Sequence, residues 1–337
     1  MYFDVRFRAN PLRLFGISPD ETKFARRGFP AADPAVQRHL ETAGRNFVNG
    51  YNAALANPQA VTLAAALDNL DGLYRGFAFE GAAMALALLD LVTPWNRRRL
   101  HRFIDSPAGD RHVYMLHVGA GWAVARHPWA KRHFERAMQR FHPLYRWLLL
   151  DGYGFHEGFF HTAEYVGARA TPGRLSHHAA RVFDQGLGRS MWFSQGGDPK
   201  RLAAVVSGFP VQRQDDLWSG VGLAATYAGG VDRDLLEDLQ GRAAEHAPQL
   251  AQGAAFAAKA RLRAGNFVPH TELACDVFCG MPAEDAAAIT DDCLRELPAD
   301  GTESAYQVWR TRIRRRLEAE KEKISRQRIA AQAPASP

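Results

Sequence analysis

The sequence has only three cysteines in 337 residues. A small, odd number of cysteines does not form the disulfide framework of a secreted domain, so a reducing compartment is the simpler interpretation. The first twenty residues also lack an apolar segment followed by a small-residue cleavage site. These two absences predict a cytoplasmic protein.

Long apolar runs are absent as well. The most apolar stretch, residues 81–92, follows Glu80 and is interrupted by Asp90. A membrane-spanning helix needs about 20 apolar residues, and this stretch is shorter. The sequence therefore predicts no transmembrane segment.

A surplus of positive charge is absent outside the C-terminal part, although the whole chain has a formal net charge of +6. Residues 310–328 contain nine Lys or Arg and three Glu, and this surplus of six equals the whole excess. The rest of the chain is close to neutral, which argues against a nucleic acid partner. We expect this basic segment to form a solvent-exposed helix whose removal leaves stability nearly unchanged; docking on an acidic partner or an anionic membrane is the alternative.

Familiar cofactor motifs are missing too. The sequence contains no Walker loop, Rossmann fingerprint, nucleophile elbow or paired C-x-x-C. It therefore indicates no particular cofactor.

What the sequence does contain is a repeated pattern, clearest in GFAFEGAAMALALLD at residues 76–90. A leucine precedes a glycine by 18 positions three times, and an alanine follows each of these glycines by four positions. The three glycines are Gly81, Gly220 and Gly253. Weaker versions of the pattern surround Gly119, Gly158 and Gly186.

Glycine and alanine four residues apart form a ridge of small residues on one helix face, which favours close approach of helix backbones. The pattern predicts an all-α protein of helical hairpins that stack as repeats, in a curved solenoid or a closed α/α toroid. An ordinary helical bundle is the alternative. We expect an N-terminal arm at 1–30, a repeat domain at 31–298, and a basic helix with a disordered tail at 299–337.

Polar residues precede most of the repeat glycines. They are Glu80, Glu157, Gln185, Ser219 and Gln252, with His117 close to Gly119. If equivalent helices line one concave face or ring, these side chains converge on one cavity. Glu80 would then be a carboxyl group in apolar surroundings with a raised pKa. Alternatively, each residue bonds to the neighbouring repeat.

A second set of polar residues lies in the glycine segment around Gly158. On a continuous helix, Glu157, His161 and Glu164 share one face and could hold a divalent metal or form an acid–base pair. His156 lies about 140° from His161 on such a helix, so the segment is not a zincin motif. We name Glu157, His161 and Glu80 as catalytic candidates, and place His156 and Glu164 among the cavity-lining residues. A purely structural hydrogen-bonded cluster is the alternative.

Several longer strings are similar to one known family as a set. They are LFGI and FARRGF near the start, RGFAFEGAAMALALLD, HVYMLHVGAGWAVAR, LDGYGFHEGFFH, FDQGLGRSMWF, DLWSGVGLAATYAGGVDR, LAQGAAFAAKAR and PHTELAC. Together they resemble the UnbL-like family of bacterial proteins, which is encoded in the warhead cassettes of enediyne polyketide pathways. The likeness covers roughly residues 10–295 and brings no catalytic residues with it.

This resemblance implies a role in the maturation of an enediyne-type polyketide. The expected ligand is a linear polyene or polyketide intermediate, bound in an apolar cavity and processed there if the protein is an enzyme. Other warhead-cassette proteins are the expected protein partners. The alternative function is a non-catalytic helical-repeat scaffold that docks those proteins.

Overall fold

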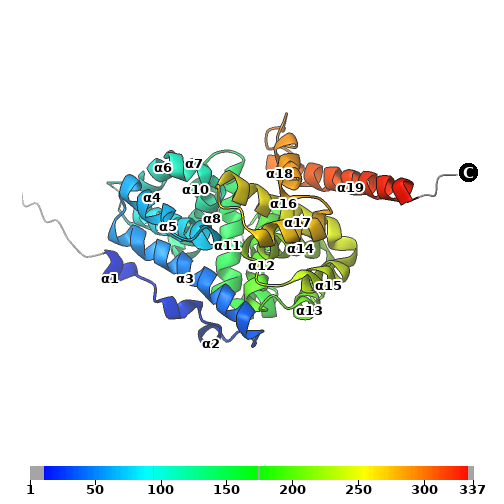
Figure 1. Ribbon diagram of the computed structural model, residues 1–337. Coiled ribbons are helices and arrows are strands. Elements are labelled where there is room, and N and C mark those ends of the chain that lie inside the picture. Colours follow the sequence, from blue (N-terminus) through cyan, green and yellow to red (C-terminus); the bar gives the residue numbers. More distant parts are fainter. Residues whose placement is uncertain (1–10, 94, 174, 333–337) are drawn as a thin grey trace, which may run out of the picture.

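The computed structural model describes residues 11–93, 95–173 and 175–332, and within them the chain is helical with no β-strand (Figure 1). In chain order the helices are α1 (Pro11–Phe15), η1 (Pro19–Thr22), α2 (Phe24–Arg27), α3 (Pro34–Ala56), α4 (Ala60–Asp68), α5 (Gly72–Val92), α6 (Arg99–Ile104), α7 (Pro107–Arg111), α8 (Val113–Arg126), α9 (Pro128–Arg132), α10 (Phe134–Met138), η2 (Tyr145–Trp147), α11 (Leu148–Phe160), the π-helix η3 (Ala163–Gly167), α12 (His177–Ser194), α13 (Pro199–Ser207), α14 (Val211–Ala228), α15 (Arg233–Ala243), η4 (Ala244–His246), α16 (Ala247–Arg263), α17 (Pro269–Cys279), α18 (Ala283–Asp292) and α19 (Ala305–Gln332). The all-α prediction is confirmed. Over the described ranges, none of these helices has the length and apolarity needed to cross a membrane.

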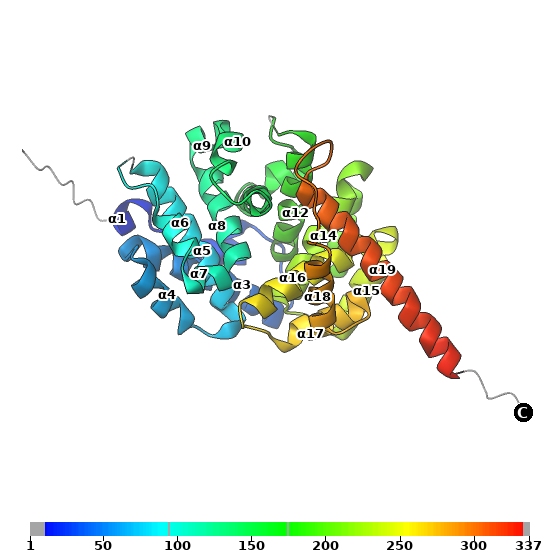
Figure 2. The same cartoon turned by 90° about the horizontal axis from the view of Figure 1, so that it is seen from above.

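Seven long helices form the body of the molecule, and each packs against the next one along the chain. They are α3, α5, α8, α11, α12, α14 and α16. The shorter helices connect them (Figures 1 and 2). This succession agrees with stacked repeats; the finer choice between a solenoid and a closed ring stays a prediction.

The long helices contact one another through glycines at equivalent positions. A Cβ atom on any of these glycines would lie 1.8 to 2.1 Å from a carbonyl oxygen of the preceding long helix. The pairs are Gly81 with Phe47, Gly119 with Glu80, Gly152 with Val118, Gly186 with Asp151, Gly220 with Gln185, and Gly253 with Ser219. Only glycine permits so close an approach. The predicted equivalence of Gly81, Gly220 and Gly253 is therefore confirmed.

One member of the predicted series is wrong. Gly158 faces the Ser190 side chain, whereas Gly152 contacts the Val118 carbonyl oxygen and takes the equivalent position. A second glycine, two residues after the first, faces the following long helix in four cases. These are Gly121 against Leu149, Gly154 against Phe183, Gly188 against Leu217, and Gly222 against Leu250. The residue that precedes the repeat glycine in α11 is thus Asp151, not Glu157.

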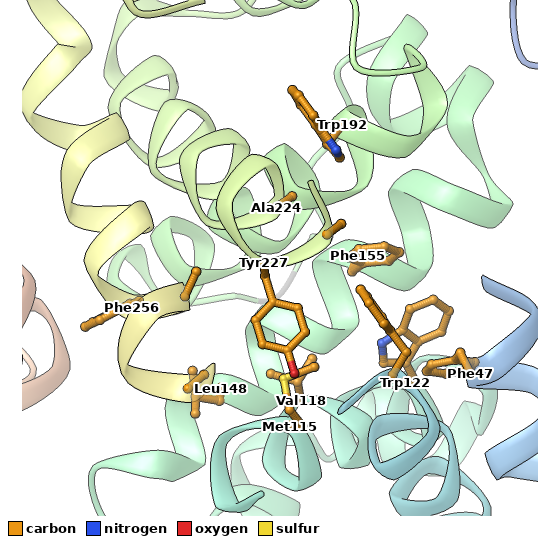
Figure 3. Close-up of a cluster of buried hydrophobic side chains, with 14 of the residues drawn as sticks. Phe47, Met115, Val118, Trp122, Leu148, Phe155, Trp192, Ala224, Tyr227 and Phe256 are labelled. Atoms are coloured by element: carbon orange, nitrogen blue, oxygen red, sulfur yellow. The ribbon is translucent and has the colours of Figure 1, made fainter. Parts of the chain in front are cut away.

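Large apolar side chains from the long helices meet in the interior of the body. Figure 3 shows Tyr227 of α14 close to Met115 and Val118 of α8, with Phe256 of α16 and Leu148 of α11 on one side. Helices distant in the sequence therefore share one core.

A buried arginine links the beginning and the end of the series of long helices. Arg261 of α16 donates hydrogen bonds of 3.0 Å to the carbonyl oxygens of Gly72 and Leu73, at the start of α5. The same guanidinium donates to the carbonyl oxygen of Tyr227 at the end of α14. The early and late helices are therefore neighbours in space.

The N-terminal arm, predicted at 1–30, falls partly outside the described residues, at 1–10. Residues 11–30 form α1, η1 and α2 beside α3. Asn52 of α3 holds this segment by exchanging hydrogen bonds with the backbone of Ile17, and Tyr51 donates to the Phe15 carbonyl oxygen. The arm therefore lies on the body.

The prediction of a solvent-exposed C-terminal helix is wrong for the first half of α19. Tyr306, Trp309, Ile313 and Leu317 follow helical spacing and are buried. Arg310 is fully buried and pairs with Asp216 of α14 at 2.7 Å. Because this segment is rich in arginine and lysine, its composition does not reveal the buried apolar residues on one face of the helix. The predicted disordered tail lies mostly outside the described residues, at 333–337.

Candidate functional site

A groove of about 930 Å³ is lined by residues of α9, α10, η2, α11 and the start of α12. Its lining includes the aromatic residues Phe134, Trp147, Tyr153 and Tyr165, the basic residues Lys131, Arg132, Arg136 and Arg146, and one acid, Glu135. The remaining lining residues are Pro128, His133, Met138, Gln139, Pro172, Gly173, Leu175, Ser176 and Ala179. We call this cavity the basic groove.

A buried carboxylate, that of Glu157, lies next to the aromatic side of the basic groove. Lys131 lies over the ring of Tyr153 at 5.3 Å from its centroid, and its Nζ atom is 2.7 Å from Oε1 of Glu157. Burial, helped by the negative charges of Glu157 and Glu164, raises the pKa of Tyr165 to about 12, and burial raises that of Tyr153 further. Both phenols therefore stay protonated at neutral pH.

Glu157 is the centre of a cluster at the end of α11. Its side chain is 1% exposed, and Oε2 is 2.5 Å from Nδ1 of His161, whose side chain is 49% exposed. His156 is buried, and its Nδ1 is 3.9 Å from Oε1 of Glu157. Desolvation holds the pKa of His156 well below its usual value, so this imidazole is neutral. The Glu157 carboxylate thus lies next to the neutral imidazole of His156, the exposed imidazole of His161 and the ammonium group of Lys131.

The sequence predicted that Glu157 and His161 share a site, but it predicted Glu164 as the third residue of that site, where the structure has His156. The prediction assumed a helix that continues to Glu164, whereas α11 ends at Phe160 and His161 has non-helical dihedral angles. The His161 side chain therefore does not point in the direction that it would take on a continuous helix, and its ring lies near that of His156. Glu164 lies exposed in η3, outside the cluster of His156, Glu157 and His161.

Glu80 lies in a different part of the molecule. Trp122 Nε1 donates to its Oε1 at 3.0 Å, and Arg189 is 3.8 Å away. Burial raises the pKa of Glu80 to about 7, against the opposing effects of Arg189 and Trp122, so the predicted raised pKa is confirmed. The surrounding pocket, of about 50 Å³, includes Phe155 and is separate from the basic groove.

The other predicted cavity residues bond inside the core instead of lining the basic groove. Gln185 donates to Asp151 at 2.6 Å and to the Tyr306 hydroxyl at 3.0 Å. Ser219 donates to Gln252 at 2.8 Å, and Arg310 donates to the same Gln252 oxygen. These contacts match the alternative in which the residues join neighbouring repeats.

His117 is also buried, and its Nδ1 is 2.7 Å from the Val113 carbonyl oxygen. Burial lowers the pKa of His117 to about 4. This histidine is a neutral part of the core and does not reach the basic groove.

Sequence reasoning missed two groups of charged residues. The first is the ion pair of Asp151 and Arg189, both buried, with Glu80 nearby. The second is Lys131, the partner of Glu157, which was not distinguished from other surface cations. Asp151 could have been found from the strings GAG, GYG, GLG and GVG, since these mark the paired glycines of α8, α11, α12 and α14.

These observations define an all-α protein with a basic, aromatic groove beside a buried carboxylate–histidine cluster. A family model described as "Protein of unknown function (DUF1702)" matches residues 7–317, and the chain belongs to this family. Comparison with curated proteins found no match, and comparison with solved structures found none. The description of the family states no activity, so the link with enediyne pathways stays a prediction.

Proposed function

We propose that this protein binds a linear unsaturated polyketide chain in the basic groove and acts in the maturation of an enediyne-type polyketide. The observation that carries the proposal is the pairing of aromatic and cationic side chains in a groove of about 930 Å³. Cavities of roughly 300–1,000 Å³ are typical of small-molecule sites.

Aromatic side chains suit the body of such a ligand. A conjugated polyene is flat and apolar with an extended π-system, so it can pack against the rings of Trp147, Tyr153 and Tyr165. The buried Nε1 of Trp147 has no hydrogen-bond partner among the described residues, which leaves an N–H available to a ligand oxygen.

Cationic side chains suit one end of the ligand. Arg146 pairs with Asp300, and Lys131 pairs with Glu157. Arg132 and Arg136 are exposed at the groove and have no ion pair within the described ranges. A carboxylate or phosphate-bearing terminus would be attracted to these two guanidinium groups.

Any chemical step on the bound chain is assigned to Glu157 and His161. Their carboxylate and imidazole are in contact, and Lys131 joins them to the basic groove, since it contacts Glu157 and lines the groove. Glu80 lies in a separate pocket and is assigned no step.

Binding can be tested with a linear conjugated tetraene carboxylic acid, whose fluorescence rises on transfer from water to an apolar site. We expect Trp147→Ala to weaken binding by about tenfold, which corresponds to one lost aromatic contact. Trp129→Ala is the matched control, because Trp129 is half exposed and does not line the basic groove. Equal effects of the two substitutions would contradict the location of the site.

A second pair of variants tests the charged end. Arg132→Gln with Arg136→Gln should weaken binding of the tetraene acid more than binding of its methyl ester. The control, Arg97→Gln with Arg98→Gln, removes the same charge elsewhere on the surface and should not distinguish the two ligands.

In a producing organism, deletion of the gene should cause a linear polyene to accumulate. Absence of tetraene binding would instead favour the alternative, a scaffold that docks other pathway proteins.

A further inference from the structure

We propose that His156, Glu157 and His161 bind one divalent transition-metal ion of the zinc type, in exchange for the ammonium group of Lys131. Metal binding here does not require a ligand in the basic groove, although Glu157 and His161 are also the residues to which a step on that ligand is assigned. It differs from the metal set predicted from sequence, because His156 takes the place of Glu164.

The geometry of the donors supports the proposal. One donor atom from each of the three side chains can be chosen so that all three lie within 4.8 Å of one another. Ligands about 2.0–2.1 Å from a tetrahedral zinc ion lie about 3.3 Å apart. The two oxygens of the Glu157 carboxylate face the two imidazoles: Oε2 is 2.5 Å from Nδ1 of His161, and Oε1 is 3.9 Å from Nδ1 of His156. To bind one ion, the side chains would rotate until each donor atom lies about 2 Å from it.

The electrostatics favour a cation at this position. Glu157 is almost completely buried and lies in the last turn of α11, where the backbone carbonyl groups add partial negative charge. A buried carboxylate requires a positive partner. Lys131 provides it at 2.7 Å, but its side chain is 36% exposed and comes from the five-residue helix α9. Its ammonium group can leave the site without disturbing the core.

His156 supplies the second observation that points to a ligand. Its buried Nδ1 has no hydrogen-bond partner within the described residues and lies on the side of Glu157 Oε1. The rings of Trp122 and Phe160 pack against the imidazole and fix its orientation. An oriented imidazole nitrogen without a hydrogen-bond partner is a suitable metal ligand.

The ligand set also indicates the chemical type of the ion. Two imidazoles and one carboxylate are the protein ligands of one class of catalytic zinc sites, in which a water molecule completes the coordination. His161 is half exposed, so the fourth position of the ion would be accessible to water. The structure therefore favours an open site over a closed structural one.

The test uses the full chain, stripped of metal with a chelator and titrated with Co²⁺ alone. We expect one ion per chain, with the intense visible absorption of four-coordinate cobalt, and displacement by Zn²⁺. His161→Asn should weaken binding by at least about tenfold, since one of three protein ligands is lost. His133→Asn is the control, because His133 lies on the same side of the molecule but outside the cluster.

Lys131→Met provides a second, independent measurement. If the ion replaces the ammonium group, removal of that competing charge should strengthen Co²⁺ binding by about tenfold or more. Far-UV circular dichroism would establish that each variant is folded. Absence of Co²⁺ binding, or binding that neither His161→Asn nor Lys131→Met changes, would overturn the proposal.

Discussion

A Cβ atom placed on Gly220 would lie 1.9 Å from the carbonyl oxygen of Gln185, because α14 and α12 meet there backbone to backbone. We expect Gly220→Ala to force the helices apart and lower the free energy of unfolding by about 1–3 kcal/mol. Denaturant unfolding measures this change.

Gly241 in α15 is the matched control for that substitution, because nothing lies within 4 Å of the position that a Cβ atom would take there. Gly241→Ala should stabilise the protein by up to about 1 kcal/mol, since alanine favours the helix. Similar shifts in both variants would mean that the close helix contact has no energetic role.

Removal of residues 299–337 should strongly destabilise the protein. Tyr306 and Trp309 are buried, and Arg310 compensates the buried carboxylate of Asp216. Loss of a single large aromatic core residue already costs about 3–5 kcal/mol, so we expect either a larger loss or failure to fold. Thermal and denaturant unfolding are the measurements. A shorter deletion, of residues 325–337, retains these contacts and should leave the melting temperature nearly unchanged.

The buried pair of Asp151 and Arg189 can be tested with a double-mutant comparison. Arg189→Met leaves the Asp151 carboxylate without its cation and should cost about 3–5 kcal/mol of unfolding free energy. Adding Asp151→Asn removes the stranded charge and can keep the hydrogen bond to Gln185. The double variant should therefore be more stable than Arg189→Met alone. If it is equally or less stable, the charge of Asp151 is not what makes the single variant unstable.

Glu80 should make stability fall as the pH rises from about 4.5 to about 7. Its pKa is raised from 4.5 to about 7 on folding, so between these pH values the folded protein binds more protons than the unfolded chain. The stabilising contribution is complete below pH 4.5 and is lost as the pH increases to 7. The total change is on the order of 3 kcal/mol.

The measurement is the free energy of unfolding at pH 5 and pH 8 in the original chain and in Glu80→Gln. Glutamine can still accept from Trp122 but does not ionise, so the variant should lose less stability between the two pH values. Asp184, whose pKa burial raises to about 6, contributes in the same direction in both proteins. An identical pH dependence would show that Glu80 does not titrate in this range.

The helical class and the positions of five of the six repeat glycines could be predicted because both depend on local sequence spacing. The glycine of α11 was misplaced because two candidates, Gly152 and Gly158, lie in this helix, and only contacts between helices distinguish them. The sequence of α19 contains four apolar residues at the spacing of a buried helix face, which are Tyr306, Trp309, Ile313 and Leu317. They were overlooked because the arginines around them make the segment as a whole strongly charged.

The candidate site was predictable only in part for a similar reason. Glu157 and His161 are four residues apart, so their contact follows from helix geometry. The approach of His156 depends on where α11 ends, and no capping residue marks that end in the sequence. Lys131 lies 26 residues before Glu157, on another helix, and charge pairing over such separations requires the three-dimensional arrangement.

The burial of Arg310 has a consequence for the order of folding during synthesis. Asp216 and Gln252 belong to helices that leave the ribosome well before α19, yet both use Arg310 as a partner. Gln185 likewise bonds to Tyr306. Before residues 306–310 emerge, Asp216, Gln252 and Gln185 have only their other partners, which are Arg181, Ser219 and Asp151. Since chains fold from the N-terminus as they are made, the polar atoms that still lack a partner must stay hydrated until then. The nascent chain should therefore remain loosely packed around α12, α14 and α16 until then, and ribosome stalling before residue 306 should expose this region to protease.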